Sequence, residues 1–412
     1  MQVDQTATIW TAVGGVLVFL MIPAIGMLEA GFVRRVNAIS ALSKGLLAFA
    51  VFLPIWFAVF PLYFGGVLVD GFYPTGADAG IPWPVYAFFL GVFGAVTLAL
   101  IAVGAPERLK FGGWVLFSIF FSAVQWPLVA SWIWGGGFLA RLGSITGWAP
   151  GLGVRDFAGG TVVHAYAGLA GLMATLVLGP SLRRRAGDGV QKAFAYKESL
   201  EYKYSELPYG LVGTALLYFG WFGFNAGSAL APNVQMAYAL VNTAVAGSLA
   251  GALSVALSKL FDGVWSPVAL VGGLLGGLVA ITPLAGFIDV PFSFLVGALA
   301  ALTTYFGTKF VERYYSVDDP VGSLPVHGFN GVLGSALVSV LAYPPLAGAA
   351  GLIYGGSPGW VATQLLGMAV ALGFVSATTY GFFKALTALG LRASLEEELV
   401  GLDVVDHGVE RI

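Results

Sequence analysis

The sequence of 412 residues contains no cysteine. Disulfide bonds, thiolate nucleophiles and thiolate metal sites are therefore excluded. Charge is also scarce, because Asp, Glu, Lys and Arg together make up 10% of the residues, against roughly 25% in an average soluble domain. Hydrophobic residues make up 58%, and the mean hydropathy is +0.87. A soluble protein of this length could not bury so much apolar surface, so the sequence predicts a protein of the lipid bilayer.

The composition narrows the possible partners further. The Lys and Arg residues form no basic patch interleaved with aromatic residues, which argues against a nucleic-acid partner. The 59 glycines are about twice the usual share of ~7%. They lack the three-residue period of collagen and lie inside apolar runs. Small residues bring membrane helices into close contact, so the glycines favour a tightly packed helical bundle.

Eleven apolar runs are long enough to cross a bilayer, which takes about 20 residues. They lie at residues 8–33, 38–66, 82–104, 111–133, 157–180, 207–230, 235–258, 263–284, 289–313, 325–343 and 360–391. No basic segment of a signal peptide precedes the first run, so we expect that run to remain as a spanning helix. The sequence predicts an all-α polytopic protein with one transmembrane domain over residues 1–391 and a cytosolic tail over residues 392–412.

The distribution of basic residues sets the expected orientation. With the N-terminus outside, all 19 Lys and Arg residues except Arg141 and Arg155 fall on the inner side. Basic residues concentrate in cytoplasmic loops, so we expect the N-terminus outside and the C-terminus in the cytoplasm. The last helix would be ~47 Å long and therefore tilted. We expect the outer segment 135–156 to cap a vestibule, and the basic inner loop 181–206 to be solvated, with partner docking as the alternative.

Two stretches of the sequence share one spacing, in which an Asp precedes a His by eight residues and glycines follow the His at +4 and +7. The two sets are Asp156, His164, Gly168 and Gly171, and Asp319, His327, Gly331 and Gly334. This spacing predicts two five-helix repeats, at residues 8–180 and 207–343, with the helix 360–391 outside them. Because five is odd, the repeats would be inverted, as in many transporters with a midplane site.

His164 and His327 are the histidines inside predicted spans, whereas His407 lies in the tail. Ionisable residues inside a membrane are costly and usually line a pathway or pair with one another. One alternative is a pair of packing histidines bonded to backbone carbonyls. A metal site would need a third ligand, and an enzyme would need a nucleophile and a base, and neither is evident. We therefore expect no metal and no cofactor.

A set of aromatic residues lies within or at the outer ends of the spans: Phe93, Trp134, Trp221 and Phe224. An interfacial aromatic belt is the ordinary interpretation of such residues. Phe93 is deeper and has small neighbours. With a hydroxyl such as that of Ser228, these rings could hold a small cation by cation–π attraction, worth up to ~2 kcal/mol when desolvated.

Three polar positions near the ends of predicted helices have ordinary structural interpretations. Asp156 is a good N-cap for the helix that carries His164, and it could also stabilise a cation vestibule. Glu29 is expected to reach the inner surface beside Arg34. Ser394, followed three residues later by Glu397, predicts a capping box at the start of the tail.

Several motifs resemble the ammonium transporter family (Amt/Mep). They are D-F-A-G-G-T-V-V-H (156–164), W-F-G-F-N-A-G-S-A (221–229), V-H-G (326–328), W-G-G-G (134–137), E-R-L-K-F (107–111) and G-L-D-V-V-D-H-G (401–408). The similarity runs from the first span to the tail. The first two motifs are long and specific, and in the related Rh proteins we would not expect this same set with its tryptophans.

The resemblance implies a homotrimer in the plasma membrane, with one pore per subunit, that serves nitrogen uptake. It also assigns roles by matching motifs: recruitment of ammonium to Phe93, Trp134 and Ser228 with support from Asp156, a phenyl gate to Phe93 and Phe224, and the pore to His164, His327 and Trp221. The tail from Ser394 would couple subunits and respond to PII-type signal proteins.

The sequence departs from the family pattern at a few positions. Trp126 stands where the family often has Tyr, and the stretch 60–65 is unusual. Gly322 stands where an Asp is common, which leaves Asp318 and Asp319 for any role at the inner end. These departures concern regulation and the inner mouth more than the substrate.

The expected function is transport in which ammonium is captured outside, loses its proton and crosses as ammonia past the two histidines, while the proton is relayed separately. An electroneutral ammonia channel is the first alternative. A sensor that binds ammonium with little flux is the second, but a sensor should carry a signalling domain and only residues 392–412 follow the last span. A membrane enzyme lacks a catalytic set.

Overall fold

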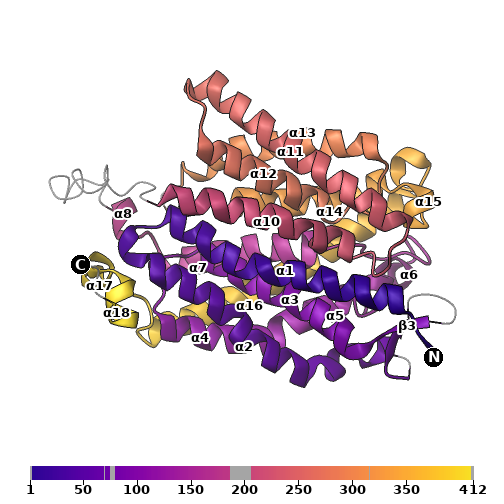
Figure 1. The fold of residues 1–412 in the computed structure, drawn as a ribbon, viewed down its shortest axis with the longest axis horizontal. Coiled ribbons are helices and arrows are strands. Elements are labelled where there is room, and N and C mark those ends of the chain that lie inside the picture. Colours follow the sequence, from indigo (N-terminus) through magenta and orange to yellow (C-terminus); the bar gives the residue numbers. More distant parts are fainter. Residues whose placement is uncertain (1, 69, 75–78, 186–205, 315, 410–412) are drawn as a thin grey trace.

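The fold is a bundle of helices that run side by side along the long axis of the molecule (Figure 1). The structure is a computed structural model that describes residues 2–68, 70–74, 79–185, 206–314 and 316–409. The N-terminal end of α1 (Gln5–Phe32) lies at one end of the bundle. The tail helices α17 (Leu395–Val400) and α18 (Leu402–His407) lie at the opposite end (Figure 1).

The described helices follow the apolar runs closely. The longer ones are α1, α2 (Ala38–Phe64), α3 (Trp83–Val103), α4 (Phe111–Phe120) continued by η3 (Phe121–Gln125) and α5 (Trp126–Ile133), η5 (Gly160–Ala165) with α7 (Tyr166–Leu178), α10 (Leu207–Gly227), α11 (Val234–Asp262), α12 (Pro267–Ile281), α13 (Val290–Val311), η7 (Leu324–Phe329) with α14 (Asn330–Leu341), and α16 (Pro358–Ala388). Each lies within a few residues of a predicted span.

Within the described part of the chain, ten helices are long and apolar enough to cross a membrane. The span predicted at 263–284 corresponds to α12, which has only 15 residues because Gly263–Ser266 form a turn before it and the chain turns again after Ile281. Since a straight crossing takes about 20 residues, a count of eleven crossings stays a prediction. Residues 186–205, which make up most of the predicted inner loop, lie outside the described residues.

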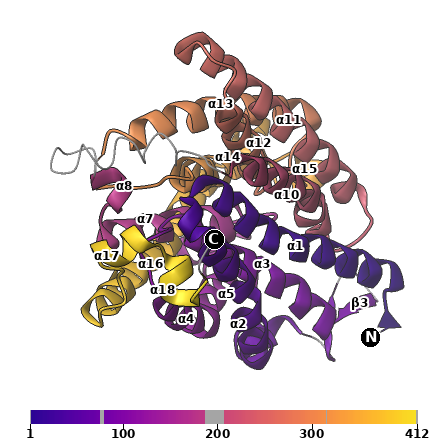
Figure 2. The ribbon, with the colours of Figure 1, turned by 60° about the vertical axis from the view of Figure 1, so that its left-hand side comes forward.

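The helices form two groups that meet along α1 and α10. In Figure 2 the helices α1–α5 lie together on one side, and α11–α14 lie on the other. Where α1 crosses α10, a Cβ on Gly31 would come within 3.0 Å of the backbone of Gly210, and a Cβ on Gly213 would do the same at Leu28. Glycine is therefore required for this close backbone approach, as in other packed membrane helices.

Short elements complete the end of the bundle opposite the tail. A three-stranded sheet of order β1-β3-β2 pairs β1 (Gln2–Val3) parallel to β3 (Ala79–Pro82), and β2 (Phe72–Pro74) antiparallel to β3. The segment predicted to cap a vestibule contains η4 (Leu139–Arg141) and α6 (Leu142–Thr146).

The tail helices are held by polar contacts to the ends of the membrane helices. Asp403 accepts hydrogen bonds from the backbone N–H groups of Ser40 (2.7 Å) and Ile39 (3.2 Å) in the first turn of α2. Asp406 accepts one from Phe111, the first residue of α4. Both carboxylates thus lie at positive helix N-termini, where a negative charge is stabilising. The predicted capping box of Ser394 and Glu397 is confirmed.

A buried carboxylate connects this tail to two other segments. Glu398 is fully buried and forms an ion pair with Arg392 at 2.7 Å. It also accepts a hydrogen bond from the backbone N–H of Leu182, just after α7. Its backbone carbonyl accepts a hydrogen bond from the Arg34 guanidinium. The tail is therefore part of the packed end of the bundle opposite the N-terminus.

The expectation for Glu29 was wrong. Its side chain does not reach the surface but is buried at 1% exposure, and its Oε1 has no hydrogen-bond partner among the described residues. Arg34 pairs instead with Glu107, from Nε to Oε1 at 3.1 Å. Arg34 lies beyond the end of α1, where its side chain meets Glu107 in the segment between α3 and α4, which local sequence spacing could not reveal.

Candidate functional site

The two membrane histidines lie in unusual helical turns of the same kind. His164 is in η5 and His327 is in η7, and both segments are π-helical, with hydrogen bonds from residue i to i+5. Such turns are rare in proteins, and those that occur are often found at functional sites. Each turn continues into an ordinary helix, α7 or α14. The sequence search did not foresee this geometry, because π turns have no hydrophobic period of their own.

An aspartate stands at the start of each turn. The Asp156 carboxylate accepts hydrogen bonds at 2.7–3.0 Å from four successive backbone N–H groups, those of residues 159–162. Asp319 accepts two, from Ser323 and Leu324. The N-cap position itself is taken by Gly159, so the Asp156 side chain caps η5 as the sequence predicted, but from three residues earlier. Because both of its oxygens are occupied, it acts on the site chiefly by holding the backbone of η5.

The two imidazole rings are stacked inside the bundle. Their centroids are 5.4 Å apart and their planes differ by 19°. The packing around them is reciprocal, because a Cβ on Gly168 would lie within 3.0 Å of Gly328, and a Cβ on Gly331 would do the same at Ala165. In each case the glycine at His +4 of one segment meets the residue at His +1 of the other. The glycines of the shared spacing thus let the two histidine segments touch.

The histidine nitrogens are mostly free of protein partners. His164 is completely buried, and within the described residues neither Nδ1 nor Nε2 has a hydrogen-bond partner; the same is true of Nδ1 of His327. Buried polar atoms are nearly always paired. The alternative of packing histidines bonded to backbone carbonyls therefore fits His164 poorly, and the nitrogens are suited to a small polar species beside them.

Aromatic rings continue the line from the histidines toward Trp134. His164 stacks on Trp221 at 5.1 Å and lies 5.5 Å from Phe224, centroid to centroid. Phe224 stacks on Phe93 at 4.1 Å, and Phe93 meets Trp134 edge-on at 5.9 Å. Rings that the sequence placed in distant spans are thus consecutive neighbours, ending at the two imidazoles.

Hydrogen bonds fix the orientation of the outer rings in this line. The Trp134 Nε1–H donates to the backbone carbonyl of Asp156 at 2.8 Å. The Trp221 Nε1–H donates to Thr282 Oγ1 at 2.9 Å. Ser228 donates its hydroxyl to the carbonyl of Phe224, so it lies one helical turn from that ring. Sequence reasoning missed Thr282, which a search for buried hydroxyls in the short span around α12 could have suggested.

The end of the bundle that holds the tail carries a buried ion pair and a second cap. Arg108 pairs with Asp318 at 3.2 Å, and Asp318 also accepts a hydrogen bond from the backbone N–H of Ser181. Burial raises the pKa of Asp319 to about 6, while the backbone N–H groups of Leu324 and Ser323 oppose this shift. Asp318 and Asp319 thus have structural partners at this end of the bundle.

Comparison with known proteins shows the family to which this chain belongs. The sequence model of the Ammonium Transporter Family matches residues 9–411. An ammonium transporter of Aquifex aeolicus is 35% identical over 99% of this chain and 93% of its own length. Ammonium transporter Amt1 of Archaeoglobus fulgidus is 32% identical, with 97% of each chain covered.

Solved structures similar to this chain are also Amt and Mep2 proteins. The structure titled Sensor Amt Protein has a TM-score of 0.81 at 26% identity, with 98% of each chain covered. Mep2 of Saccharomyces cerevisiae has a TM-score of 0.80 at 26% identity, with 96% of this chain and 89% of Mep2 covered. The resemblance found in the motifs is confirmed, and this multi-pass plasma membrane protein belongs to the ammonium transporter family.

Proposed function

We propose that the chain captures ammonium at the outer rings, removes its proton and conducts ammonia past His164 and His327. The observation that carries the proposal is the continuous line of rings from the half-buried Trp134 through the buried Phe93 and Phe224 to the two imidazoles. In this scheme Trp134, Phe93 and Ser228 recruit the cation. Phe93 and Phe224 form the gate beneath them, and Trp221 lines the pore beside His164.

The energetics favour deprotonation over passage of the intact ion. Moving an unpaired cation into an apolar interior costs tens of kcal/mol by idealised solvation estimates. Neutralising an amine with a lysine-like pKa of ~10.4 at pH 7 costs at most about 4.6 kcal/mol. Potassium has no proton to lose and would bear the full desolvation cost. The same step therefore accounts for both conduction and selectivity.

The histidines suit the neutral species. An imidazole carries one donor and one acceptor in its neutral form, so the unpaired nitrogens of the stacked pair can hydrogen-bond ammonia or relay the released proton. A relayed proton would make transport electrogenic. A proton left outside would make the protein a neutral ammonia channel, which is the alternative within the same pore.

A sensor with little flux is the second candidate, and one observation favours it: a structural neighbour over nearly the whole chain is titled Sensor Amt Protein. Against it, the matched sequence relatives are named ammonium transporters. Binding of ammonium to the purified protein without any flux would support the sensor.

The architecture belongs to the same proposal. We infer eleven crossings with the N-terminus outside, two inverted five-helix repeats over residues 8–180 and 207–343, and α16 outside them. The paired π turns and the reciprocal glycine contacts support the repeats. We also propose a homotrimer, and a cytosolic tail over residues 392–412 that can respond to a PII-type protein, which the docked helices α17 and α18 support.

Selectivity tests the deprotonation scheme. Proteoliposomes of the purified protein should show ammonium uptake at least tenfold faster than potassium uptake under the same gradient, since each 1.4 kcal/mol of extra barrier slows passage about tenfold. Protein-free liposomes give the background. Comparable rates for the two cations through the intact pore would argue against deprotonation.

A further inference from the structure

Two backbone carbonyls occupy the same place relative to the two histidines. Val162 O and Pro325 O each lie two residues before a histidine, within η5 and η7. In an α-helix the backbone N–H of Tyr166 would donate to Val162 O, four residues earlier. In η5 it donates instead to Thr161 O and Val163 O. The widened ladder of a π turn leaves such a carbonyl without an N–H at α-helical spacing. Inside a membrane, that carbonyl needs another donor.

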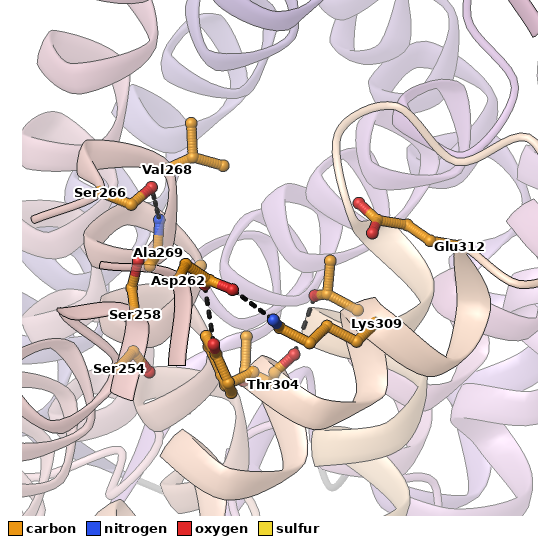
Figure 3. Close-up of a pocket in the computed structure, with 12 residues that line it drawn as sticks. Ser254, Ser258, Asp262, Ser266, Val268, Ala269, Thr304, Lys309 and Glu312 are labelled. Carbon is orange, nitrogen blue, oxygen red and sulfur yellow. Dashed lines mark hydrogen bonds and ion pairs between the residues drawn. The ribbon is translucent and has the colours of Figure 1, made fainter. Parts of the chain in front are cut away.

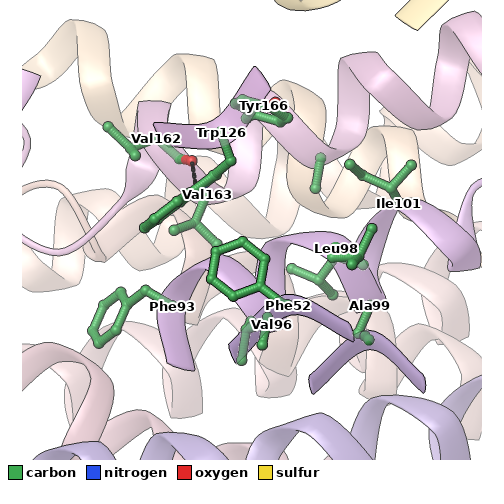
Figure 4. Packing of buried hydrophobic residues seen from close by; sticks show 14 of the residues in the cluster. Phe52, Phe93, Val96, Leu98, Ala99, Ile101, Trp126, Val162, Val163 and Tyr166 are labelled. Atoms are coloured by element: carbon green, nitrogen blue, oxygen red, sulfur yellow. Dashed lines mark hydrogen bonds between the residues drawn. The ribbon is translucent and has the colours of Figure 1, made fainter. Parts of the chain in front are cut away.

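Trp126 supplies the donor in the first turn. Its Nε1–H donates to Val162 O over 3.3 Å, as Figure 4 shows. The indole is fully buried and is held edge-on by Trp56 at 5.1 Å and Phe52 at 5.4 Å, centroid to centroid. Trp126 belongs to α5, so the contact fastens η5 to a different helix.

Asn330 supplies the donor in the second turn. Its side-chain Nδ2 donates to Pro325 O at 3.0 Å and to Thr304 Oγ1 at 2.8 Å. Its own backbone N–H donates to His327 O, so the side chain provides a separate donor. Asn330 is fully buried, and Thr304 belongs to α13. This contact therefore fastens η7 to a neighbouring helix, just as Trp126 fastens η5.

The second contact lies at the floor of a polar pocket. Thr304 lines a cavity of about 230 Å³ between α11, α12 and α13 (Figure 3). Asp262 and Lys309 form an ion pair at this cavity. Thr304 thus links the Asn330 amide to a polar region outside the line of rings.

We propose that Trp126 and Asn330 are positioning residues for the two histidines: each holds the carbonyl two residues before its histidine and thereby fixes the rotation of that imidazole. Without the donor, the π turn can pair its carbonyl by narrowing toward α-helical spacing, which moves the histidine around the helix axis. The effect on transport rests on the proposed function, in which the imidazoles line the pore.

The test compares four variants in pairs. Trp126→Phe and Asn330→Leu remove the donors while keeping apolar bulk. Trp114→Phe is the matched control for the first, because the Trp114 Nε1–H also donates to a buried carbonyl, that of Lys44. Asn242→Leu is the control for the second, because the Asn242 amide donates to the carbonyls of Ala285 and Ile288.

The first readout does not depend on transport. The chain has 3 histidines, so the imidazole nitrogen signals of histidine-labelled protein in liposomes can be assigned by removing each in turn. We expect Trp126→Phe to shift the His164 signals and Asn330→Leu to shift the His327 signals, each leaving the other histidine unchanged. The controls should shift neither. Unchanged signals in both variants, or shifts in both histidines that the controls reproduce, would overturn the proposal.

The second readout separates this proposal from the proposed function. Ammonium uptake into the same liposomes should fall roughly tenfold or more in both variants, because small misplacements of an active group have effects of this size. In Asn330→Leu the ammonium concentration at half-saturation should stay unchanged, because the Asn330 amide bonds Thr304 and Pro325 and no recruitment residue. The Trp126 ring meets Trp134 edge-on at 6.4 Å, so half-saturation is compared only for Asn330→Leu and its control. Selective signal shifts with unchanged uptake would uphold the positioning of the histidines and contradict their role in conduction.

Discussion

At the scale of single residues, the site depends on polar groups that are held by hydrogen bonds to the backbone or to a buried hydroxyl. Asp156, Trp134 and Trp221 are each held by hydrogen bonds to carbonyls, N–H groups or a hydroxyl. By contrast, both ring nitrogens of His164 lack a partner among the described residues. A rigid polar frame around an imidazole with unpaired nitrogens is the arrangement that a site for a small hydrogen-bonding solute needs.

The four hydrogen bonds of Asp156 predict that its removal lowers the stability of the protein more than the removal of an ordinary helix cap. Asp156→Ala should destabilise the protein by about 3 kcal/mol or more, because hydrogen bonds to charged groups are worth about 1.5–3 kcal/mol each and do not add fully. Asp289→Ala is the control, since Asp289 caps α13 through one hydrogen bond, to Val290, and should cost about 1 kcal/mol. Thermal unfolding in detergent gives the comparison. Equal losses in the two variants would contradict this view of Asp156.

Recruitment by cation–π attraction predicts a change in apparent affinity. Trp134→Leu should raise the ammonium concentration for half-maximal uptake by up to about 30-fold, the equivalent of ~2 kcal/mol. Trp132→Leu is the control, because the Trp132 ring packs on Phe138 and Phe374, away from the line of rings. An unchanged half-saturation in Trp134→Leu would remove Trp134 from the recruitment site.

At the scale of helices, hydropathy and turn signals predicted the long apolar helices, but not the short strands β1–β3 or helices such as η4 and α6. The predicted spans 38–66, 82–104 and 111–133 differ by at most two residues at either end from the helical segments observed there. Lipid imposes a length and an apolar composition on each crossing, which is why such boundaries can be read from sequence. The family motifs also indicated the residues that the fold brings together as a line of rings.

The details that sequence could not supply depend on contacts between helices. The π turns at His164 and His327 arise from an extra residue in the helical ladder, which leaves no periodic signal. The partner of Arg34 was likewise misjudged, because Glu107 lies in a segment far along the chain. The shared spacing of an aspartate and two glycines around each histidine was the visible trace of the paired turns.

Contact between the histidine segments predicts a strict requirement for glycine. Gly168→Ala and Gly331→Ala should each abolish ammonium uptake or prevent folding, because the added Cβ would lie within 3.0 Å of backbone atoms. Gly373→Ala in α16 should be tolerated, since its Cβ would meet nothing within 4 Å. The measurement compares the expression level and the ammonium uptake of the three variants. Normal uptake in either histidine-segment variant would show that the two segments do not pack as described.

At the scale of the whole molecule, the tail connects the ends of several helices. Glu398 joins the tail to Leu182 and to Arg34, and Arg392 donates a hydrogen bond to the carbonyl of Leu178 at the end of α7. Asp403 and Asp406 cap α2 and α4. Because α7 continues from the π turn that carries His164, displacement of the tail would act on the helix that carries that histidine. This arrangement gives the tail a physical route to influence the pore.

Docking of the tail should weaken in acid. The hydrogen bond from Lys110 lowers the pKa of Glu397, with a smaller contribution from the backbone N–H of Ser394. A lowered pKa means that Glu397 contributes to docking above its unperturbed pKa, and that the contribution is lost as pH falls through the lowered value. Hydrogen exchange of residues 394–409, corrected for intrinsic rates, should therefore be faster at low pH than at pH 7. Glu397→Gln should show the faster exchange already at pH 7, and equal protection in both proteins would contradict this role of Glu397.

The central claim is that nitrogen crosses the membrane through the pair of histidines, and an ammonium jump on proteoliposomes tests it most directly. The current evoked by the jump should saturate with ammonium concentration and should be lost in His164→Ala, with protein-free liposomes as the background. An internal pH shift without current would replace the electrogenic mechanism with a neutral ammonia channel through the same pore. Full current in His164→Ala, or neither current nor pH shift in an active wild-type preparation that binds ammonium, would contradict conduction past the histidines.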